Sequence, residues 1–308
     1  MRGIGFARSV RIAAAGAAVV AALSLLSTPQ AGAAPLCPGA GQAPVLVGRV
    51  PGAAIEGAAV DGAGRLYLTD LRSNRVLRID RPGASAVPFA TLPGPIGGGL
   101  AFAPDGGLLV GYGDARVFVG DIARPAGIVR IDVGTGAVHP FASGLSAANG
   151  LAVTRDGTVY ATNDLASLVG RVLPNGVVQP DWAVLPSANG AALSADDRYL
   201  YVSRTFVNPG VSRIPLANPA APESLVDFGG ADAFIAPDGL VLDAAGRPIV
   251  PTDISGEILR VDGPNRYCAL AGGLPGSSVL TFGSGGSGFS AGRLFRAGFD
   301  GDIYEIGA

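Results

Sequence analysis

From about residue 56 onward, short apolar runs alternate with turn residues in a pattern that recurs along the chain. Each copy has a hydrophobic run, a turn containing Asp, Gly or Asn, and a second run rich in Val, Leu and Tyr. This order is typical of a β-hairpin. The copies begin at Glu56, Gly98, Asn149, Asn189, Asp238 and, in degenerate form, Ser278, at intervals of 42, 51, 40, 49 and 40 residues.

Further strand-like runs follow the hairpins, for example at residues 75–80, 127–132 and 257–262. A repeat of about 40–50 residues fits four strands with their turns, which is one blade of a β-propeller. We therefore predict an all-β fold, a six-bladed β-propeller.

The sixth repeat is too short for four strands. It supplies only three, at residues 279–283, 293–297 and 302–306, while a strand-like run at 44–50 precedes the first repeat. We predict that this N-terminal strand completes the last blade and closes the ring, which protects the sheet edges. Closure would bring Cys37, just before that strand, near Cys268 in the outer strand of blade five. Two cysteines in an oxidising compartment favour a disulfide between them.

Residues 1–33 are typical of a secretory signal peptide. Arg2, Arg8 and Arg11 precede an uncharged run at 12–26, and Ala31-Gly32-Ala33 provides a cleavage site. The 15-residue run is too short to span a bilayer. We expect residues 34–308 to form one secreted domain outside the cytoplasm, with no membrane attachment once the signal is removed. We expect this domain to be a monomer.

Composition narrows the function classes. The chain has 48 Gly and 24 Pro residues, which argues against long helices. Hydrophobic residues make up 48% and charged residues 15%, which excludes a disordered chain. The formal net charge is −2, there is no Lys, and no run of basic residues occurs. We therefore expect no nucleic-acid partner.

Aligning the repeats places one residue of each at the start of the strand expected to line the central channel. Four of the six carry oxygen ligands, namely Glu56, Asn149, Asn189 and Asp238; the other two are Gly98 and Ser278. Such a set suits a hard cation, Ca²⁺ first, with Mg²⁺, Mn²⁺ or Zn²⁺ as alternatives. Asn-Gly and Asp-Gly pairs are also common in turns. Each repeat, however, has its hairpin turn about seven residues later, at positions such as Asp61, Asp105, Asp156, Asp196 and Asp243.

The chain resembles the senescence-marker-protein, gluconolactonase and luciferin-regenerating-enzyme-like family of six-bladed propellers over about residues 56–300. The resemblance rests on Glu56-Gly57 before 66–70, Asn189-Gly190 before 199–202, and Pro237-Asp238-Gly239. It implies that Glu56, Asn189 and Asp238 bind one divalent cation, that Asn149 helps hold the metal or substrate, and that Asp238 is also the general base. Arg204 is the positional candidate for a substrate-binding basic residue.

The leading hypothesis is a secreted, metal-dependent hydrolase of a lactone or related ester, similar to a gluconolactonase. The alternative is a non-catalytic binding propeller with a structural cation, since residues 57–80 also resemble an NHL-type repeat. Its contacts with a protein, peptidoglycan or small molecule would lie in the segments 111–128 and 204–212. A third reading is another propeller chemistry, such as a lyase or synthase.

A match to G-x-S-x-G at residues 288–292 does not change this interpretation. A serine nucleophile in that motif needs a strand, a helix and a partner histidine. The one histidine of the chain, His139, falls in the predicted outer part of blade two.

Overall fold

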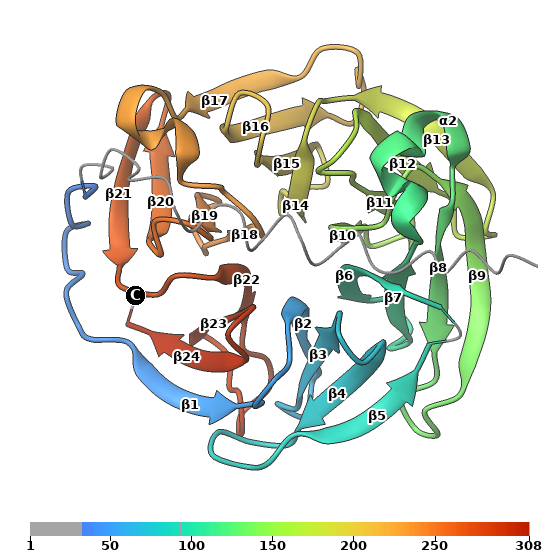
Figure 1. Ribbon diagram of the computed structural model, residues 1–308, viewed down its shortest axis with the longest axis horizontal. Helices are drawn as coiled ribbons and strands as arrows, with labels where there is room; N and C mark the ends of the chain where they lie inside the picture. Colours follow the sequence, from blue (N-terminus) through green and yellow to red (C-terminus); the bar gives the residue numbers. More distant parts are fainter. Residues whose placement is uncertain (1–32, 93, 308) are drawn as a thin grey trace, which may run out of the picture. The chain divides into compact units, whose positions relative to one another are not determined.

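Six four-stranded antiparallel sheets follow one another around a central axis in the computed structural model, which describes residues 33–92 and 94–307 (Figure 1). The predicted signal peptide lies outside these residues, apart from Ala33. Blades 1 to 3 contain β2 (Ile55–Val60), β3 (Leu66–Asp70), β4 (Arg75–Ile79), β5 (Val87–Thr91), β6 (Ile96–Phe102), β7 (Leu108–Tyr112), β8 (Ala126–Ile131), β9 (Val138–Leu145), β10 (Leu151–Val153), β11 (Val159–Ala161), β12 (Leu168–Val172) and β13 (Val178–Val184). Blades 4 to 6 contain β14 (Ala188–Leu193), β15 (Tyr199–Arg204), β16 (Gly210–Pro215), β17 (Glu223–Asp227), β18 (Val241–Leu242), β19 (Pro248–Pro251), β20 (Ile258–Gly263), β21 (Arg266–Ala271), β22 (Ser277–Phe282), β23 (Leu294–Gly298), β24 (Asp302–Ile306) and β1 (Val45–Arg49). The predicted six-bladed propeller is confirmed.

In blades 1 to 5 the first hairpin is closed by the aspartate that the repeat pattern assigns to its turn. The Asp61 carboxylate accepts hydrogen bonds from the backbone N–H groups of Ala63 and Arg65, at 3.0 and 2.9 Å. Equivalent bonds to backbone N–H groups are made by Asp105, Asp156, Asp196 and Asp243. The turn role predicted for these five residues is confirmed.

The hydrophobic core is divided into six parts, and each part lies between two neighbouring blades. Between blades 6 and 1, for example, Ile55 and Leu68 pack with Phe295 and Ile303. This arrangement leaves the central axis free of core residues, and the first strands β2, β6, β10, β14, β18 and β22 surround it (Figure 1).

The ring is closed by the N-terminal strand, as predicted. β1 pairs antiparallel with β24, and Arg49 forms an ion pair with Asp302 at 2.6 Å. Cys37 and Cys268 are joined by a disulfide, with their Cα atoms 4.9 Å apart. The backbone N–H of Cys37 also donates to the carbonyl of Ala269 in β21, at 2.9 Å. The segment before β1 is therefore attached to blade 5 before β1 completes blade 6.

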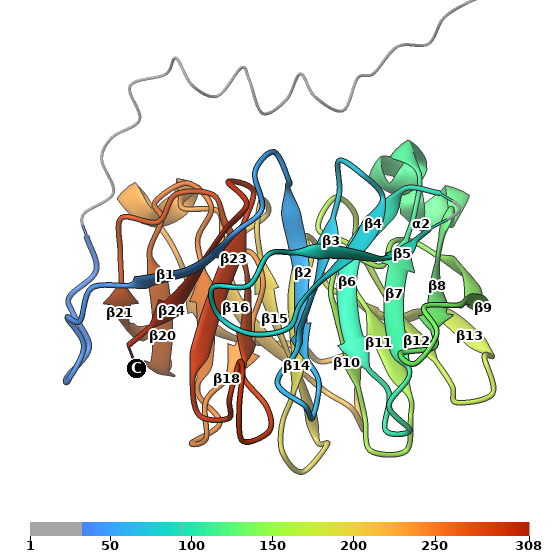
Figure 2. The ribbon, with the colours of Figure 1, turned by 90° about the horizontal axis from the view of Figure 1, so that it is seen from below.

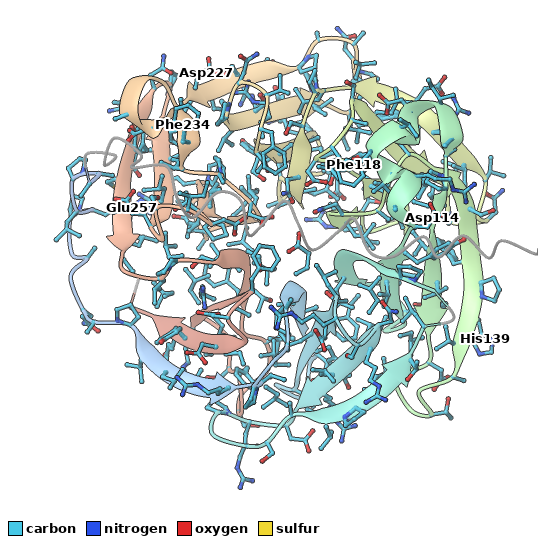
Figure 3. The ribbon with its side chains drawn as sticks, in the orientation of Figure 1. Asp114, Phe118, His139, Asp227, Phe234 and Glu257 are labelled. Carbon is cyan, nitrogen blue, oxygen red and sulfur yellow. A yellow bond between two sulfur atoms is a disulfide. The ribbon has the colours of Figure 1, made fainter. Side chains whose placement is uncertain are left out.

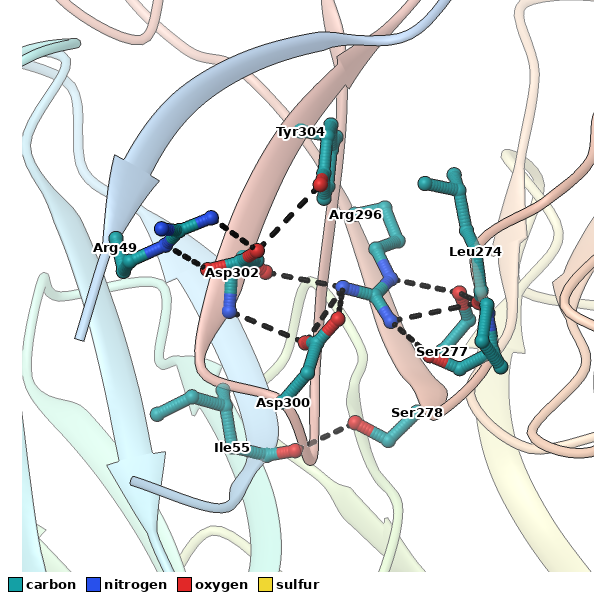
Figure 4. Close-up of polar contacts among 10 residues, drawn as sticks. Arg49, Ile55, Leu274, Ser277, Ser278, Arg296, Asp300, Asp302 and Tyr304 are labelled. Carbon is teal, nitrogen blue, oxygen red and sulfur yellow. Dashed lines mark hydrogen bonds and ion pairs between the residues drawn. The ribbon is translucent and has the colours of Figure 1, made fainter. Parts of the chain in front are cut away.

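A fully buried arginine supports this closure from inside blade 6 (Figure 4). Arg296 of β23 donates to Asp300 at 2.8 and 3.0 Å and to the hydroxyl of Ser277 at 2.6 Å. It also donates to the carbonyl oxygens of Leu274, Pro275 and Asp302. A buried guanidinium needs this many acceptors to offset its lost hydration. Its partners fix the loop that leads into β22.

Two inter-strand segments carry short helices that an all-β prediction does not include. They are the 3₁₀ helix η2 (Ala115–Val119) followed by α2 (Gly120–Ala123), and the 3₁₀ helix η3 (Gly230–Phe234). Both segments lie on the face of the propeller from which β2 begins (Figure 2). Within the described ranges, no helix has the length and apolar character needed to cross a membrane.

Candidate metal centre at the channel mouth

The inner strands enclose a cavity of about 370 Å³ along the central axis. Glu56, Asn149, Asn189 and Asp238 all line it, together with Gly99 and Leu100 of β6 and residues 279–282 of β22. The structure therefore brings the four predicted ligands together. They lie at the end of the cavity from which the inner strands begin, which we call the channel mouth.

A circle of hydrogen bonds joins the six blades at this level. In each case a hydroxyl or backbone N–H of one blade donates to a backbone carbonyl at the start of the next blade. The pairs, in order, are Thr69–Gly98, Gly99–Ala148, Thr162–Asn189, Ser203–Asp238, Gly239–Ser278 and Ser278–Ile55. Because the carbonyls belong to or adjoin the site residues, the circle fixes the backbone positions from which the four ligand side chains extend.

Gly98 has a steric role in this arrangement. A Cβ atom built on Gly98 would lie 2.6 Å from Cγ of Glu56 and 3.2 Å from the carbonyl oxygen of Asn149. Its φ of +105° also favours glycine. The absent side chain thus leaves room for Glu56 to extend toward Asn149, whose amide Nδ2 donates to Glu56 Oε1 at 3.4 Å.

The two ring carboxylates lie in an environment that opposes their charge. Burial raises the pKa of Glu56 well above its usual range, and the charges of Asp238 and Asp164 raise it further. Burial likewise raises the pKa of Asp238, and the neighbouring Asp253 adds to the effect by repulsion and by a hydrogen bond. Nearby like charges and desolvation both disfavour the ionised form. Without a counter-charge, this site would hold protons to well above the usual carboxyl range.

Asp164 and Asp253 are members of the site that repeat alignment did not identify. Burial raises the pKa of Asp164 to about 6, while a hydrogen bond with Asn149 lowers it. Burial also raises the pKa of Asp253, and its hydrogen bond with Asp238 lowers it. The sequence does contain a pattern that could have identified them. Both aspartates follow the second strand of their repeat, in the tripeptides T-N-D (162–164) and P-T-D (251–253). Asp70 occupies that place in the first repeat, yet its Oδ1 accepts from the backbone of Ala54 at 2.9 Å.

These groups fit a divalent cation. Oε2 of Glu56 and Oδ1 of Asp253 are buried and have no hydrogen-bond partner. The amide Nδ2 of Asn189 donates to the hydroxyl of Thr205 at 2.9 Å, which leaves its oxygen available to a cation. Among residues 33–92 and 94–307, no three His, Cys, Asp or Glu side chains lie close enough together to hold a metal ion. A cation here would therefore depend on the amide oxygens as well as on the carboxylates, as hard cations such as Ca²⁺ allow.

Arg204 does not lie in the channel. Its guanidinium is buried within blade 4, where it pairs with Asp227 and donates to the carbonyl oxygen of Val226 at 3.2 Å. Asp227 lies toward the outer edge of the molecule (Figure 3). The contacts of Arg204 therefore do not support the substrate-binding role suggested by its position in the sequence. His139 is also far from the channel, on the outer strand β9 (Figure 3). This position agrees with the conclusion that the G-x-S-x-G match is not a serine nucleophile with a partner histidine.

The carboxyl of Asp164 gives a pH-dependent prediction. Its pKa is about 6 in the folded protein and about 3.8 when unperturbed, so ionising it opposes folding as the pH rises through this window. In EDTA, we expect Asp164→Asn to match the wild type near pH 4 and to exceed its free energy of unfolding by up to about 3 kcal/mol at pH 7. Thermal unfolding between pH 4 and 7 measures the difference.

Asp105→Asn is the control for this series, because Arg130 holds the pKa of the Asp105 carboxyl below its usual range. That variant should lose stability relative to the wild type as the pH rises. A difference between Asp164→Asn and the wild type that does not change with pH would contradict the assignment.

The fold and the mouth define a class: a six-bladed propeller with an all-oxygen candidate cation site at one end of its channel. The profile of the SMP-30/Gluconolactonase/LRE-like region family matches residues 56–270, so the chain belongs to this family. No curated protein sequence matches the chain.

Three solved structures show the same fold. A gluconolactonase from Xanthomonas campestris is 20% identical, with a TM-score of 0.67, and the match covers 91% of this chain and 98% of that one. The calcium-binding protein regucalcin from Agrobacterium tumefaciens is 19% identical, with a TM-score of 0.69 and coverage of 86% and 93%. A luciferin-regenerating enzyme is 14% identical, with a TM-score of 0.66 and coverage of 86% and 95%.

Proposed function

We propose that this protein is a divalent-metal-dependent hydrolase of a lactone or related ester. The observation that carries the proposal is the environment of Asp238. This side chain is 3% exposed, lines the channel mouth, and has its pKa raised by burial and by the neighbouring carboxyl of Asp253. Membership in a family that includes gluconolactonases supports the same reaction class. Ca²⁺ is the preferred cation because the donors are all oxygens and because a similar fold is that of a calcium-binding protein.

The residues of the channel mouth would have two roles, cation binding and proton transfer. Glu56, Asn149, Asn189 and Asp238 would hold the cation, which when bound polarises the substrate carbonyl and stabilises negative charge on its oxygen. Asp238 accepts the proton of the attacking water as general base, and it returns that proton to the alcohol that leaves. Asp253 lies beside Asp238 and raises the pKa of its carboxyl, which favours a proton-accepting role. A base in such a setting is most effective when its pKa lies near the working pH.

Turnover of lactones and esters in the presence of Ca²⁺, Mg²⁺, Mn²⁺ or Zn²⁺ tests this function. We expect one of these ions to support hydrolysis and EDTA to abolish it. Asp238→Asn should reduce kcat by about 10²–10⁴-fold, because it removes the proton acceptor. Asp243→Asn is the matched control, since Asp243 lies in the same blade but only closes a turn, and it should retain activity.

Unchanged hydrolysis by Asp238→Asn would rule out the assignment of the base. If a cation stabilises the protein but no lactone or ester is hydrolysed, the binding propeller with a structural cation becomes the better description.

A further inference from the structure

Exposed apolar side chains surround the channel mouth. We define the apolar collar as Leu71, Phe118, Phe206, Phe234 and Ile254, which are 36%, 59%, 61%, 64% and 50% exposed. They come from five different connections, those between β3 and β4, β7 and β8, β15 and β16, β17 and β18, and β19 and β20. Figure 3 shows Phe118 and Phe234 on two sides of the central opening. Large exposed apolar side chains around an opening are typical of a contact site.

Hydrogen bonds tie the collar of blades 4 and 5 directly to the site residues. The backbone N–H of Phe206 donates to the Ser187 hydroxyl at 2.7 Å, and the preceding Thr205 accepts from Asn189. Ile254 directly follows Asp253, and its N–H donates to the carbonyl oxygen of Ile235 at 3.1 Å. Phe234 precedes Ile235 at the end of η3, four residues before Asp238.

The other two collar residues are anchored in the same way. The N–H of Leu71 donates to the carbonyl oxygen of Ala54 at 2.9 Å, two residues before Glu56. Phe118 follows Val117, whose carbonyl oxygen accepts from the Asn163 amide at 3.1 Å. Asn163 in turn precedes Asp164, the hydrogen-bond partner of Asn149. The loops that carry the collar are therefore joined by hydrogen bonds to the backbone around the candidate metal centre.

The side chains at the channel mouth offer no positive charge to an anionic ligand. The residues that line the cavity include two carboxylates and no Arg or His, and Asp164 and Asp253 add two more carboxyls beside it. Arg204, the basic residue suggested by the sequence, is paired with Asp227. An anionic sugar acid would find no cationic side chain among the lining residues. A ligand with many hydroxyl groups would meet apolar side chains at the collar.

We propose that the collar binds the hydrocarbon part of the substrate, so that the preferred substrate is a neutral lactone or ester with an alkyl or aromatic group. This inference rests on the proposed function and names its substrate class. The carbonyl would lie at the channel mouth, and the apolar group would extend outward over the collar. Continuity with the site favours the substrate over a separate partner as the occupant.

Hydrolysis of γ-lactones with progressively longer side chains, from γ-butyrolactone to γ-decanolactone, tests the proposal in the presence of the activating cation. Burial of one methylene is worth about a threefold to fourfold effect on binding. We expect kcat/KM to rise at least about tenfold across the series, through KM, and glucono-δ-lactone to be a poorer substrate. Phe206→Ser/Phe234→Ser should abolish most of this rise. Val87→Ser/Val184→Ser, which changes exposed residues on outer strands, is the matched control and should preserve it.

Equal chain-length dependence in the collar variant and the wild type would overturn the proposal. A second result would also overturn it. If the collar variant no longer co-sediments with phosphatidylcholine vesicles but keeps the chain-length dependence, the collar binds a lipid surface and not the substrate. If no lactone is hydrolysed, calorimetric measurement of the binding of the same lactones tests the collar proposal separately from the hydrolase function. Tighter binding of γ-decanolactone that depends on the collar would then support the collar while the hydrolase function fails.

Discussion

Ca²⁺ at about a thousandfold excess over its Kd is expected to raise the melting temperature of the protein by about 10 °C. Such an excess stabilises the folded state by about 4 kcal/mol, and each kcal/mol shifts the melting temperature of a domain of this size by a few degrees. The physical reason is the group of four carboxyls at the mouth, two of which have a buried oxygen atom without a partner. A cation held by Glu56 and Asp238 would reduce the repulsion among these carboxyls and provide a partner for the buried Oε2 of Glu56.

The Glu56→Gln/Asp238→Asn variant tests whether the cation binds at the channel mouth. In EDTA it should melt at a higher temperature than the wild type, because two buried carboxylates that repel each other become neutral amides. With Ca²⁺ it should show no further rise. The order of the two melting temperatures therefore reverses when the ion is added, which a variant that merely misfolds would not show.

Asp61→Asn/Asp243→Asn is the matched control, since these aspartates lie in the same two repeats but only close turns. It should lose some stability and keep the full response to Ca²⁺. An equal rise in the ring variant and the wild type would place the cation elsewhere in the molecule.

The repeat pattern was sufficient to predict the fold because each blade carries its own signals. The alternation of apolar and polar residues predicts the strands, and the Asp in the first hairpin of five repeats predicts the turn. Closure was predictable for a similar reason: a last repeat one strand short and an unassigned run near the N-terminus leave one arrangement without an open edge. The disulfide followed from that arrangement.

The candidate site was predicted only in part. Residues at equivalent repeat positions were found because backbone geometry alone brings them together. The direction of a side chain after the second strand depends instead on local contacts that differ between repeats. Asp253 faces Asp238, whereas Asp70 turns back to cap its own loop. The position of the Arg204 side chain was unpredictable for the same reason, because its ion-pair partner Asp227 lies on a strand more than twenty residues away in the sequence.

The starts of the inner strands also differ from the simple alignment. Asp238 lies three residues before β18, which is only two residues long, and Asn149 lies two residues before β10. Near Asp238 the cause is the preceding Ala236, which adopts a left-handed backbone conformation with φ of 55°. This turn directs the chain from η3 into the mouth. A residue other than glycine in that conformation carries a conformational cost that the surrounding contacts must offset.

Removal of the disulfide is expected to cause the largest loss of stability of any change outside the site. The bond joins residues separated by 231 positions, so in the chain-entropy account its loss lowers the free energy of unfolding by up to about 5 kcal/mol. The contacts that remain at the closure are non-covalent: β1 pairs with β24, Arg49 forms an ion pair with Asp302, and the segment before β1 keeps its backbone hydrogen bond to Ala269. Cys37→Ala/Cys268→Ala should therefore melt well below the wild type, and its β1 and β24 amides should exchange first with solvent.

Reduction of the wild-type protein provides the control for this change. Treatment with a thiol reductant should lower the melting temperature of the wild type toward that of the double variant and leave the variant unaffected. A reductant effect of the same size in both proteins would show that the loss does not come from this bond. Unchanged exchange in β1 and β24 would show that strand pairing and the Arg296 network keep blade 6 closed without the covalent link.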